Sequence, residues 1–474
     1  MKTPISYFKS ISVLFLIFTL SGCEDFLESD PKSFIAPENF YQDRDQATAA
    51  ANAIYDVLAS TGLYGSYHNY ITFGDIAANG ITQGEVAFDQ HTINSSNGIL
   101  SSMWDASYDG INRANAVIDR VPASQMQEEV KNRILGEAYF LRGLFYFNLV
   151  RIFGGVPLHT SEVNSLEKVA LAKSSEDEIY QTIVADLEKA SESLPIVPTE
   201  VGRATQGAAK TLLAKVHLTL GDFEQARNLS KEVMDLGVYE LWETYEDVFK
   251  VANENGKESV FEVQFRSNAG GEGNSKTFII PSRLTDLVMN GPVFRDYYLT
   301  EDLINLYAPE DQRAATNAVD SLIVGTDTVR FDGTVSIKYL DDSFTTDVQD
   351  ADNNFIVMRY AEVLLMFAEA ENEVAGPTAA AIDAVNQVRR RAFSQDIMSP
   401  SDYDLNAGIS QAALQQAIWD ERFREFPMEG MQWFDLKRTN RLLAIEEIEE
   451  YQAVYPIPLR EMDINQQMVQ NTGY

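Results

Sequence analysis

The chain contains many long segments in which apolar residues recur every three or four positions, the spacing of one buried face of an α-helix. The clearest covers residues 126–153, where Ile134, Leu141 and Leu149 share a face and Gly154 ends the pattern. Similar segments cover residues 43–60, 103–120, 175–194, 205–220, 226–236, 361–374, 379–392 and 409–426. Amphipathic helices in such number must pack against one another, which predicts a mainly α fold.

Several of these predicted helices follow one another in pairs. Residues 205–220 lead through the turn Gly221-Asp222-Phe223 into residues 226–236, and this pair resembles a tetratricopeptide repeat unit. The same arrangement is expected for 137–153 with 175–194, for 361–374 with 379–392, and for 409–426 with a helix after Trp433. Each pair buries its apolar face only against a neighbour, so we expect the pairs to stack into a curved scaffold.

Two regions interrupt the helical pattern. Residues 61–104 are rich in glycine, asparagine, serine and aromatic residues and show little sustained period. Residues 238–358 form a loop-rich insertion with short strand-like runs, at 259–265, 321–331 and 335–340. Long irregular stretches of compact proteins often carry function, so we expect functional residues in both regions.

The N-terminus has the features of a lipoprotein export signal. A polar start with two lysines is followed by a short apolar run at residues 11–20, and Leu20-Ser21-Gly22 stands directly before Cys23. A membrane-spanning helix needs about 20 apolar residues, so the run indicates a cleaved signal peptide, residues 1–22. Cys23 is the only cysteine in the chain, and its thiol would carry the lipid that tethers the protein to a membrane. The alternative is a chance cysteine beside an ordinary cleavage site.

The residues that follow Cys23 are acidic, contain proline and show no apolar periodicity. We therefore predict three parts: the signal peptide, a lipidated tether at residues 23–38, and one body at residues 39–474. Within the body, the irregular regions are residues 61–104 and 238–358.

Composition argues against several classes of function. The chain has 474 residues, 45% of them hydrophobic, which is enough for a large buried core. Its net charge of −34 makes nucleic acid and anionic lipid poor partners, because both recruit clustered Lys and Arg. A neutral or cationic ligand suits this charge better than an acidic polysaccharide. The four histidines lie far apart in the sequence, so we expect no zinc site and no cofactor.

Two acidic patterns have a functional and a structural interpretation. Glu421, Glu425 and Glu429 are spaced so that two carboxylates could reach the separation that glycosidases use. Basic residues close by favour an ion-pair network instead: Arg422, Arg424, Lys437 and Arg438. The second pattern is an oxygen-rich loop that contains Asp347, Asp350, Asp352 and Asn354. It could bind calcium, but it lacks the glycine of the standard calcium loop, so a solvated loop is the simpler interpretation. No Gly-x-Ser-x-Gly motif or Cys-His pairing is present, which argues against an enzyme.

Several segments together resemble the SusD/RagB family. They are the lipoprotein box, residues 138–158 (AYFLRGLFYFNLVRIFGGVPL), residues 359–370 (RYAEVLLMFAEA), residues 421–438 (ERFREFPMEGMQWFDLKR), and the C-terminal segments 455–465 (YPIPLREMDIN) and 471–474 (NTGY). Their order and spacing extend the resemblance from the leader to the C-terminus. The stretch Trp419–Phe423 departs from it, because the family usually carries an arginine-rich run there.

This resemblance implies a SusD-like fold and a lipid-anchored, surface-exposed protein of the outer membrane of Bacteroidota. Such a protein binds an oligosaccharide or polysaccharide without altering it and passes it to a SusC-like TonB-dependent transporter. Glu24 and Asp25 resemble the acidic signal that directs such lipoproteins to the cell surface. Three alternatives remain open: a peptide or other non-sugar nutrient in the same transport role, a polysaccharide-degrading enzyme, and a scaffold that binds proteins through its helix repeats.

Sugar binding requires aromatic faces against pyranose rings and polar groups that bind hydroxyls. By analogy with ligand positions in the family, the candidates in the first irregular region are Tyr67, Tyr70, Phe73, Asp75, Asn79 and Phe88. The candidates in the second region are Arg266, Asn268, Arg283, Tyr297 and Tyr298. For each aromatic residue the alternative is packing in the core.

Overall fold

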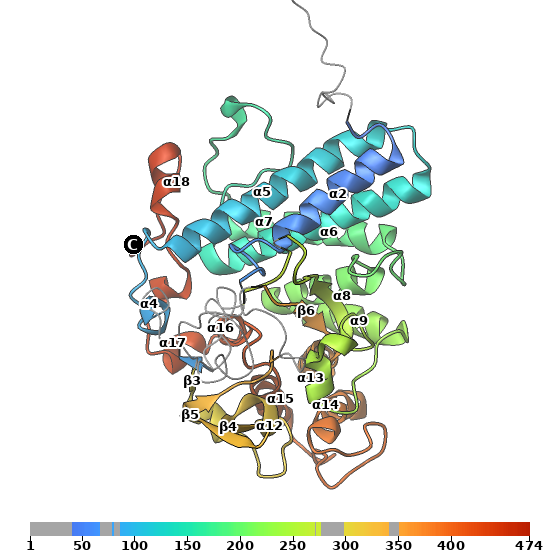
Figure 1. Ribbon diagram of the computed structural model, residues 1–474, viewed down its shortest axis with the longest axis vertical. Helices are drawn as coiled ribbons and strands as arrows, with labels where there is room; N and C mark the ends of the chain where they lie inside the picture. The colour runs from blue at the N-terminus through green and yellow to red at the C-terminus, as the bar shows by residue number, and fades with distance from the viewer. Residues whose placement is uncertain (1–39, 67–77, 80–85, 271, 276–297, 341–349) are drawn as a thin grey trace, which may run out of the picture. The chain divides into compact units, whose positions relative to one another are not determined.

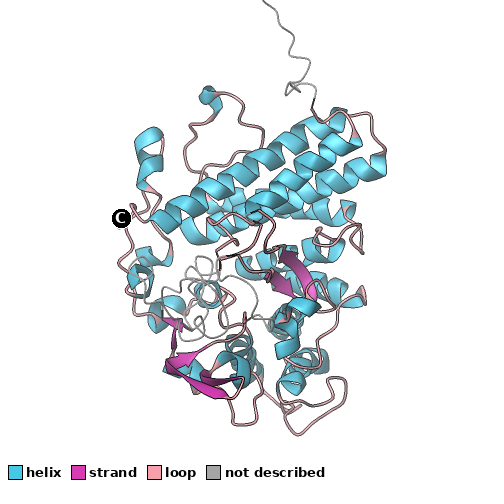
Figure 2. Ribbon diagram, in the orientation of Figure 1, coloured by secondary structure: helices cyan, strands magenta, loops and turns pink. Residues whose placement is uncertain are grey.

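A computed structural model describes residues 40–66, 78–79, 86–270, 272–275, 298–340 and 350–474 (Figure 1). The chain divides into two units, residues 1–40 and 41–474. Within the described ranges, helices predominate and the strands form three separate two-stranded sheets (Figure 2). The fold is therefore mainly α, as predicted. No helix in those ranges combines the length and apolar character needed to cross a membrane.

The helices match most of the predicted segments. In the first half they are α2 (Arg44–Leu58), α4 (Val86–Asp89), α5 (Gly98–Arg120), α6 (Glu128–Phe153), α7 (Glu176–Ser193), α8 (Gln206–Leu220) and α9 (Phe223–Asp235). In the second half they are α11 (Glu301–Ile304), α12 (Ala314–Asn317), α13 (Tyr360–Ala375), α14 (Ala379–Ala392), α15 (Gln411–Glu425), α16 (Gln432–Arg438), α17 (Leu442–Ile445) and α18 (Leu459–Ile464).

Capping side chains explain where several helices begin. Ser175 and Glu178 form the predicted capping box at the start of α7. Helix α5 begins at Gly98, earlier than the predicted residue 103, because the Asn97 side chain accepts hydrogen bonds from the backbone N–H groups of Ile99 and Leu100.

Three of the four predicted helix pairs, α6 with α7, α8 with α9 and α13 with α14, pack together. Helices α2, α5, α6 and α7 lie side by side, α7 packs on α8, and α8 packs on α9 (Figure 1). The turn between α8 and α9 uses Gly221 at a φ of 74°. Helix α9 packs on α13, which packs on α14 and α15. Helix α15 packs on α13 and α14 rather than forming the expected fourth packed pair with α16. An ion pair between Arg422 and Asp435 (2.8 Å) joins α15 to α16.

Helix α6 is enclosed by its neighbours, and every residue from Phe140 to Phe153 is buried. Its polar side chains therefore need partners inside the protein. The Arg142 guanidinium donates to Asp186 of α7 (2.7 Å) and to Asn115 of α5 (2.6 Å). These contacts connect three adjacent helices and fix their register.

The three sheets are antiparallel and partly follow the predictions. Strand β2 (Ser259–Val263) pairs with β6 (Phe355–Arg359), β4 (Val319–Val324) with β5 (Asp327–Val335), and β1 (Ala78–Asn79) with β3 (Tyr298–Leu299). The run 321–331 is a hairpin rather than one strand, because Gly325 turns the chain at a φ of 63°. The strand predicted at 335–340 is wrong, since β5 ends at Val335. Strand β6 was missed because all its residues are buried and show no alternation.

Helices α5 and α6 approach each other closely at Gly110. A Cβ atom at this position would lie 2.3 Å from the ring of Phe145, which is fully buried. At Gly98 in the same helix, a Cβ atom would meet nothing within 4 Å.

We therefore expect Gly110→Ala to lower the free energy of unfolding by about 1–3 kcal/mol, the usual cost of overpacking a core. Gly98→Ala is the matched control, with an expected change of at most about 1 kcal/mol because alanine also favours helix. Urea unfolding followed by circular dichroism measures both. Equal midpoints for the two variants would contradict the close crossing of α5 and α6.

Candidate functional site

Glu421, Glu425 and Glu429 lie at the centre of a buried ionic cluster. Helix α15 ends at Glu425, so Glu429 does not continue the helical face. Their exposed fractions are 0%, 0% and 3%. Carboxylates this deep in the protein are withdrawn from any ligand at the surface.

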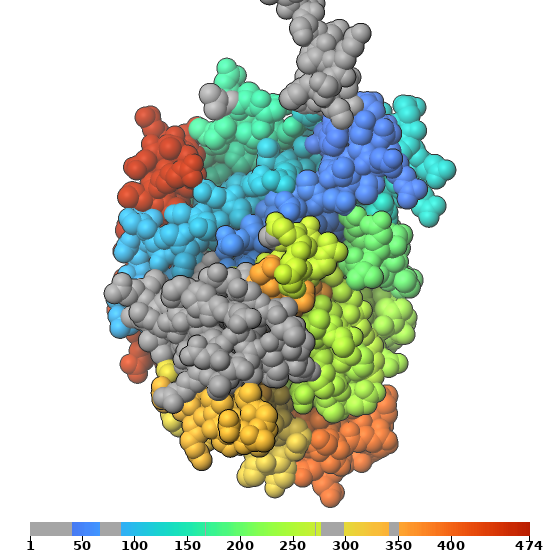
Figure 3. Space-filling model, in the orientation of Figure 1, coloured from blue at the N-terminus to red at the C-terminus, as the bar shows by residue number. Residues whose placement is uncertain are grey.

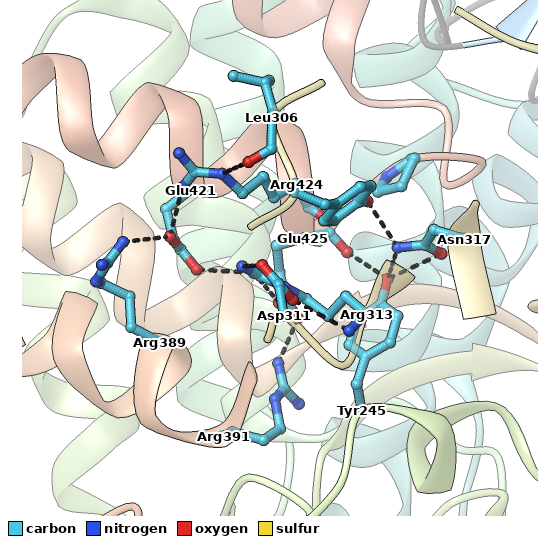
Figure 4. Close-up of polar contacts among 12 residues, drawn as sticks. Tyr245, Leu306, Asp311, Arg313, Asn317, Arg389, Arg391, Glu421, Arg424 and Glu425 are labelled. Carbon is cyan, nitrogen blue, oxygen red and sulfur yellow. Dashed lines mark hydrogen bonds and ion pairs between the residues drawn. The ribbon is translucent and has the colours of Figure 1, made fainter. Parts of the chain in front are cut away.

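One half of the cluster surrounds Arg313, as Figure 4 shows. Its guanidinium pairs with Asp311 (2.7 Å), Glu421 (2.7 Å) and Glu425 (3.0 Å). Glu421 also pairs with Arg424 (2.9 Å). Each charge is therefore matched by an opposite one, the condition under which ions are tolerated in a protein interior.

The other half surrounds Glu425 and Glu429. Arg359 pairs with Glu425 (2.6 Å) and with Glu429 (2.9 Å), and Arg391 also pairs with Glu425. Lys338 pairs with Glu429 (2.8 Å). Burial alone would raise the pKa of Glu425, but the guanidinium groups around it outweigh burial and lower the pKa to about 2.

The interpretation of these glutamates as an ion-pair network is confirmed, although most of the predicted partners differ. Arg424 binds Glu421 as expected, whereas Arg422 and Arg438 bind Asp435. The Lys437 ammonium donates to the backbone carbonyl of Arg151 (3.0 Å). The principal partners are residues distant in sequence: Arg313, Lys338, Arg359 and Arg391.

The oxygen-rich loop considered for calcium supports a neighbouring loop. Asp350 accepts a hydrogen bond from the backbone N–H of Asn268 (2.9 Å), and Asp352 accepts one from Ser267 (2.6 Å). Asn354 accepts one from Phe265 (2.9 Å), while Asp347 lies outside the described residues. Across the part of the chain that the structure describes, no three His, Cys, Asp or Glu side chains are grouped to hold a metal ion.

A cavity of about 770 Å³, which we name the α2 cleft, lies between the end of α2 and the second irregular region. It is lined by residues 55–61 at the end of α2, by α5 around Asp109, and by residues 262–266 and Glu272. The backbone N–H of Ser275 donates to the carbonyl of Gly65 (3.1 Å), which holds the second region against the first. Figure 3 shows the yellow-green segment lying against the blue end of α2.

Two arginines of this cleft form ion pairs at the surface. Arg266 and Glu272 lie 3.2 Å apart and are 73% and 63% exposed. Arg113 lies 2.8 Å from Asp109 and 3.6 Å from Asp56. Each pair presents hydrogen-bond donors and acceptors side by side at the surface, an arrangement that can bind neighbouring hydroxyl groups.

The structure describes five of the predicted ligand residues. Arg266 lines the α2 cleft, and Asn268 is exposed on the same loop with a φ of 57°. Asn79 and Tyr298 are brought together as partners in the β1–β3 sheet. Phe88 is 5% exposed and packs edge to face on Tyr455, with ring centres 5.2 Å apart, so its ring belongs to the core.

The other predicted ligand residues lie outside the described residues: Tyr67, Tyr70, Phe73, Asp75, Arg283 and Tyr297. The sequence analysis missed the cleft residues Asp56, Asp109 and Arg113 because they belong to regular helices, and it also missed Glu262 and Glu272. The spacing of Asp109 and Arg113, four residues apart on the outer face of α5, was the available signal.

Comparisons with known proteins give consistent matches. The profile of the SusD family matches residues 326–453, and a profile described as "Starch-binding associating with outer membrane" matches residues 25–218. The chain is 29% identical to SusD-like protein P25 of Formosa agariphila over 98% of this chain and 99% of the relative.

Solved structures agree with these sequence matches. A SusD homologue from Bacteroides thetaiotaomicron superposes with a TM-score of 0.81 over 92% of this chain and 98% of that chain, at 22% identity, and so supports the fold. A laminarin-binding SusD-like protein has a TM-score of 0.77 and 27% identity, over 92% of this chain and all of that chain.

The ionic cluster predicts a large effect of Glu425→Gln. The change removes the charge of a carboxylate that Arg313, Arg359 and Arg391 share, and breaking a buried ion pair costs about 3–5 kcal/mol of the free energy of unfolding. Glu232→Gln is the control, because it breaks an exposed pair with Lys210 (2.7 Å) that contributes at most about 1 kcal/mol. Guanidinium unfolding measures both changes, and a small effect of Glu425→Gln would contradict the role of the cluster.

Stability should also fall in acid. Folding lowers the pKa of Glu425 from its usual 4.5 to about 2, so the unfolded chain binds more protons between these pH values. The contribution of Glu425 is therefore complete above about pH 4.5 and is lost as the pH falls toward 2. Unfolding midpoints at pH 7, 5, 4 and 3 should decline less steeply in Glu425→Gln than in the natural protein. Parallel declines would argue against this carboxylate as a source of the acid sensitivity.

Proposed function

The chain belongs to the SusD/RagB family of glycan-binding proteins, and on this premise we propose that it is a cell-surface lipoprotein that captures a glycan for uptake. The glycan passes to a partner SusC-like TonB-dependent transporter of the outer membrane. The observation that carries the proposal is the likeness, over nearly the whole chain, to a SusD-like protein that binds laminarin. The association with the outer membrane in the description of the matching profile supports the location.

The proposed anchoring follows from the N-terminal sequence. Residues 1–22 are removed on export, Cys23 carries lipid, and residues 23–38 tether the body at residues 39–474 to the outer membrane. The acidic residues Glu24 and Asp25 direct the lipoprotein to the outer surface. The ligand-binding body then faces the medium, where polymeric nutrients are found.

The proposed ligand site combines residues of both irregular regions. Arg266 belongs to it at the α2 cleft, and Asn268 follows on the same exposed loop. The remaining members are Tyr67, Tyr70, Phe73, Asp75, Asn79, Arg283, Tyr297 and Tyr298. Carboxylates outnumber guanidinium groups along the cleft, with Asp56, Asp109, Glu262 and Glu272 against Arg113 and Arg266. This balance supports an uncharged glycan over a sulfated or uronic one.

The protein is proposed to bind the glycan without cleaving it. The carboxylates that the sequence analysis considered for hydrolysis, Glu421, Glu425 and Glu429, are buried and ion-paired. The second candidate is a peptide or other non-sugar nutrient in the same transport role. A cleft with an excess of acceptors also suits a cationic peptide, which is why peptides belong in the test.

Binding of the leader-free body, residues 24–474, to plant, algal and host polysaccharides tests the proposal. We expect binding of a neutral glycan without release of reducing sugar. We expect each of three variants to bind about tenfold more weakly: Arg266→Ala, Tyr67→Ala and Tyr70→Ala. The first loses one charge-assisted hydrogen bond, and each of the other two loses one stacked ring. Arg227→Ala is a matched control, since Arg227 of α9 pairs with Glu371 of α13 (3.8 Å), outside the cleft.

Three results would contradict the proposal in different ways. Release of reducing sugar would show an enzyme. Binding of cationic peptides but no glycan would favour the second candidate. Glycan binding that none of the three variants weakens would leave the function in place and contradict the proposed site.

A further inference from the structure

Helix α5 separates the α2 cleft from a second cavity of about 720 Å³. Its walls are α5 from Trp104 to Asn112, the segment from Pro157 to Ala170, and residues 460–468 on and after α18. We name it the α18 cavity. Figure 1 shows α18, in red, close to the first turns of α5 and to the green loop that follows α6. The volume lies within the range of about 300–1,000 Å³ typical of ligand pockets.

The floor of the α18 cavity is aromatic and firmly held. Trp104 is 3% exposed and packs on Phe153 and Tyr108, with ring centres 5.1 Å and 5.0 Å away. The Tyr108 hydroxyl donates to the carbonyl of Pro157 (2.7 Å), which fixes the opposite wall. Val169 and Ile464 are exposed apolar residues of the same lining. A preformed floor of this kind binds apolar faces of a ligand with little loss of side-chain entropy.

The rim of this cavity is polar. Arg460 and Asp105 lie 3.0 Å apart and are 67% and 52% exposed. An ion pair so exposed contributes at most about 1 kcal/mol to the fold, and its groups remain accessible to a ligand. Glu461 stands beside them, half-buried, and burial together with Asp105 raises the pKa of its carboxyl group. The rim therefore offers both donors and acceptors above an apolar floor.

The two cavities lie on either side of one exposed turn of α5. Asp109 lines both of them. Asp105, Asp109 and Arg113 follow at intervals of four residues, so they occupy successive turns on one face of α5 and extend over about 12 Å. Figure 3 shows this helix at the surface between blue α2 and red α18.

Three guanidinium–carboxylate pairs thus connect the cavities. They are Arg266–Glu272 in the α2 cleft, Arg113–Asp109 on α5, and Arg460–Asp105 at the α18 cavity. The pairs of Arg266 and Arg460 are exposed, whereas Arg113 is partly buried and also donates to the backbone carbonyl of Ala53 (2.7 Å). A repeated polar pattern along a surface fits a repeating ligand better than a compact one.

We propose that the α18 cavity is a second glycan-binding site, which holds one part of an extended neutral polysaccharide while another part lies in the α2 cleft. The inference rests on the proposed function and deepens it, because it selects long chains over short ones. Asp105, Asp109 and Glu461 outnumber Arg460 in the lining, so the site disfavours anionic polysaccharides.

The test compares long and short ligands on two variants of the rim, Arg460→Ala and Asp105→Asn. Both residues are exposed, so folding should be unchanged, which the thermal midpoint checks. The probes are laminarin, soluble starch and galactomannan, each as the polymer and as its trisaccharide, measured by calorimetry. We expect both variants to bind a polymer about tenfold more weakly, because one charge-assisted hydrogen bond is lost. Their affinity for the trisaccharide should equal that of the natural protein. Arg227→Ala should change neither affinity.

Other outcomes separate this inference from the proposed function. If Arg266→Ala weakens polymer binding and the rim variants do not, the protein has one site and the inference is wrong while the function stands. If the rim variants also lose the trisaccharide, the two-site arrangement is contradicted. If the rim variants no longer copurify with the transporter but keep full glycan affinity, the cavity is a protein interface and the inference is wrong. If the natural protein binds none of the polymers, both the inference and a role in capturing neutral glycans fail.

Discussion

The ion pairs of Glu425 hold together the second half of the structure. Glu425 ends α15, Arg391 belongs to α14, Arg359 joins β6 to α13, and Arg313 precedes α12. A buried charge is tolerated only when opposite charges and hydrogen bonds surround it, so these segments must meet in one register. Glu258, which pairs with Arg391 (2.9 Å), stands immediately before β2. The cluster therefore also positions the strand that leads into the α2 cleft.

Helix α5 connects this framework to the surface. Its inner face packs so closely on α6 that Gly110 meets the ring of Phe145, while its outer face carries Asp105, Asp109 and Arg113. Side chains on a rigid helix are held in more reproducible positions than side chains on a loop. A surface built on α5 is consequently fixed by the same packing that forms the core.

The sequence predicted those features that depend on neighbouring residues. The helix pairs, the capping box at Ser175 and the turn at Gly221 all follow from local spacing. Strand β6 could not be recognised, because complete burial removes the alternation that marks a strand. The partners of Glu425 could not be recognised either, since Arg359 and Arg391 reach it only after the chain has folded. Partners were expected among basic residues nearby, and long-range pairing overrode that expectation.

The surface residues of α5 likewise could not be recognised from the sequence as part of the candidate site. In the sequence, Asp109 and Arg113 form an ordinary pair four residues apart on an exposed helix face. What distinguishes them is tertiary: the segment at Arg266 lies on one side of the helix and α18 on the other. Arg113 joins α5 to α2 through the backbone carbonyl of Ala53 (2.7 Å). The pairs of Arg266 and Arg460 are exposed. Since exposed pairs stabilise a fold by at most about 1 kcal/mol, folding alone gives little reason for these two at the cavities. Ligand binding supplies that reason, because hydroxyl groups need donors and acceptors at accessible positions.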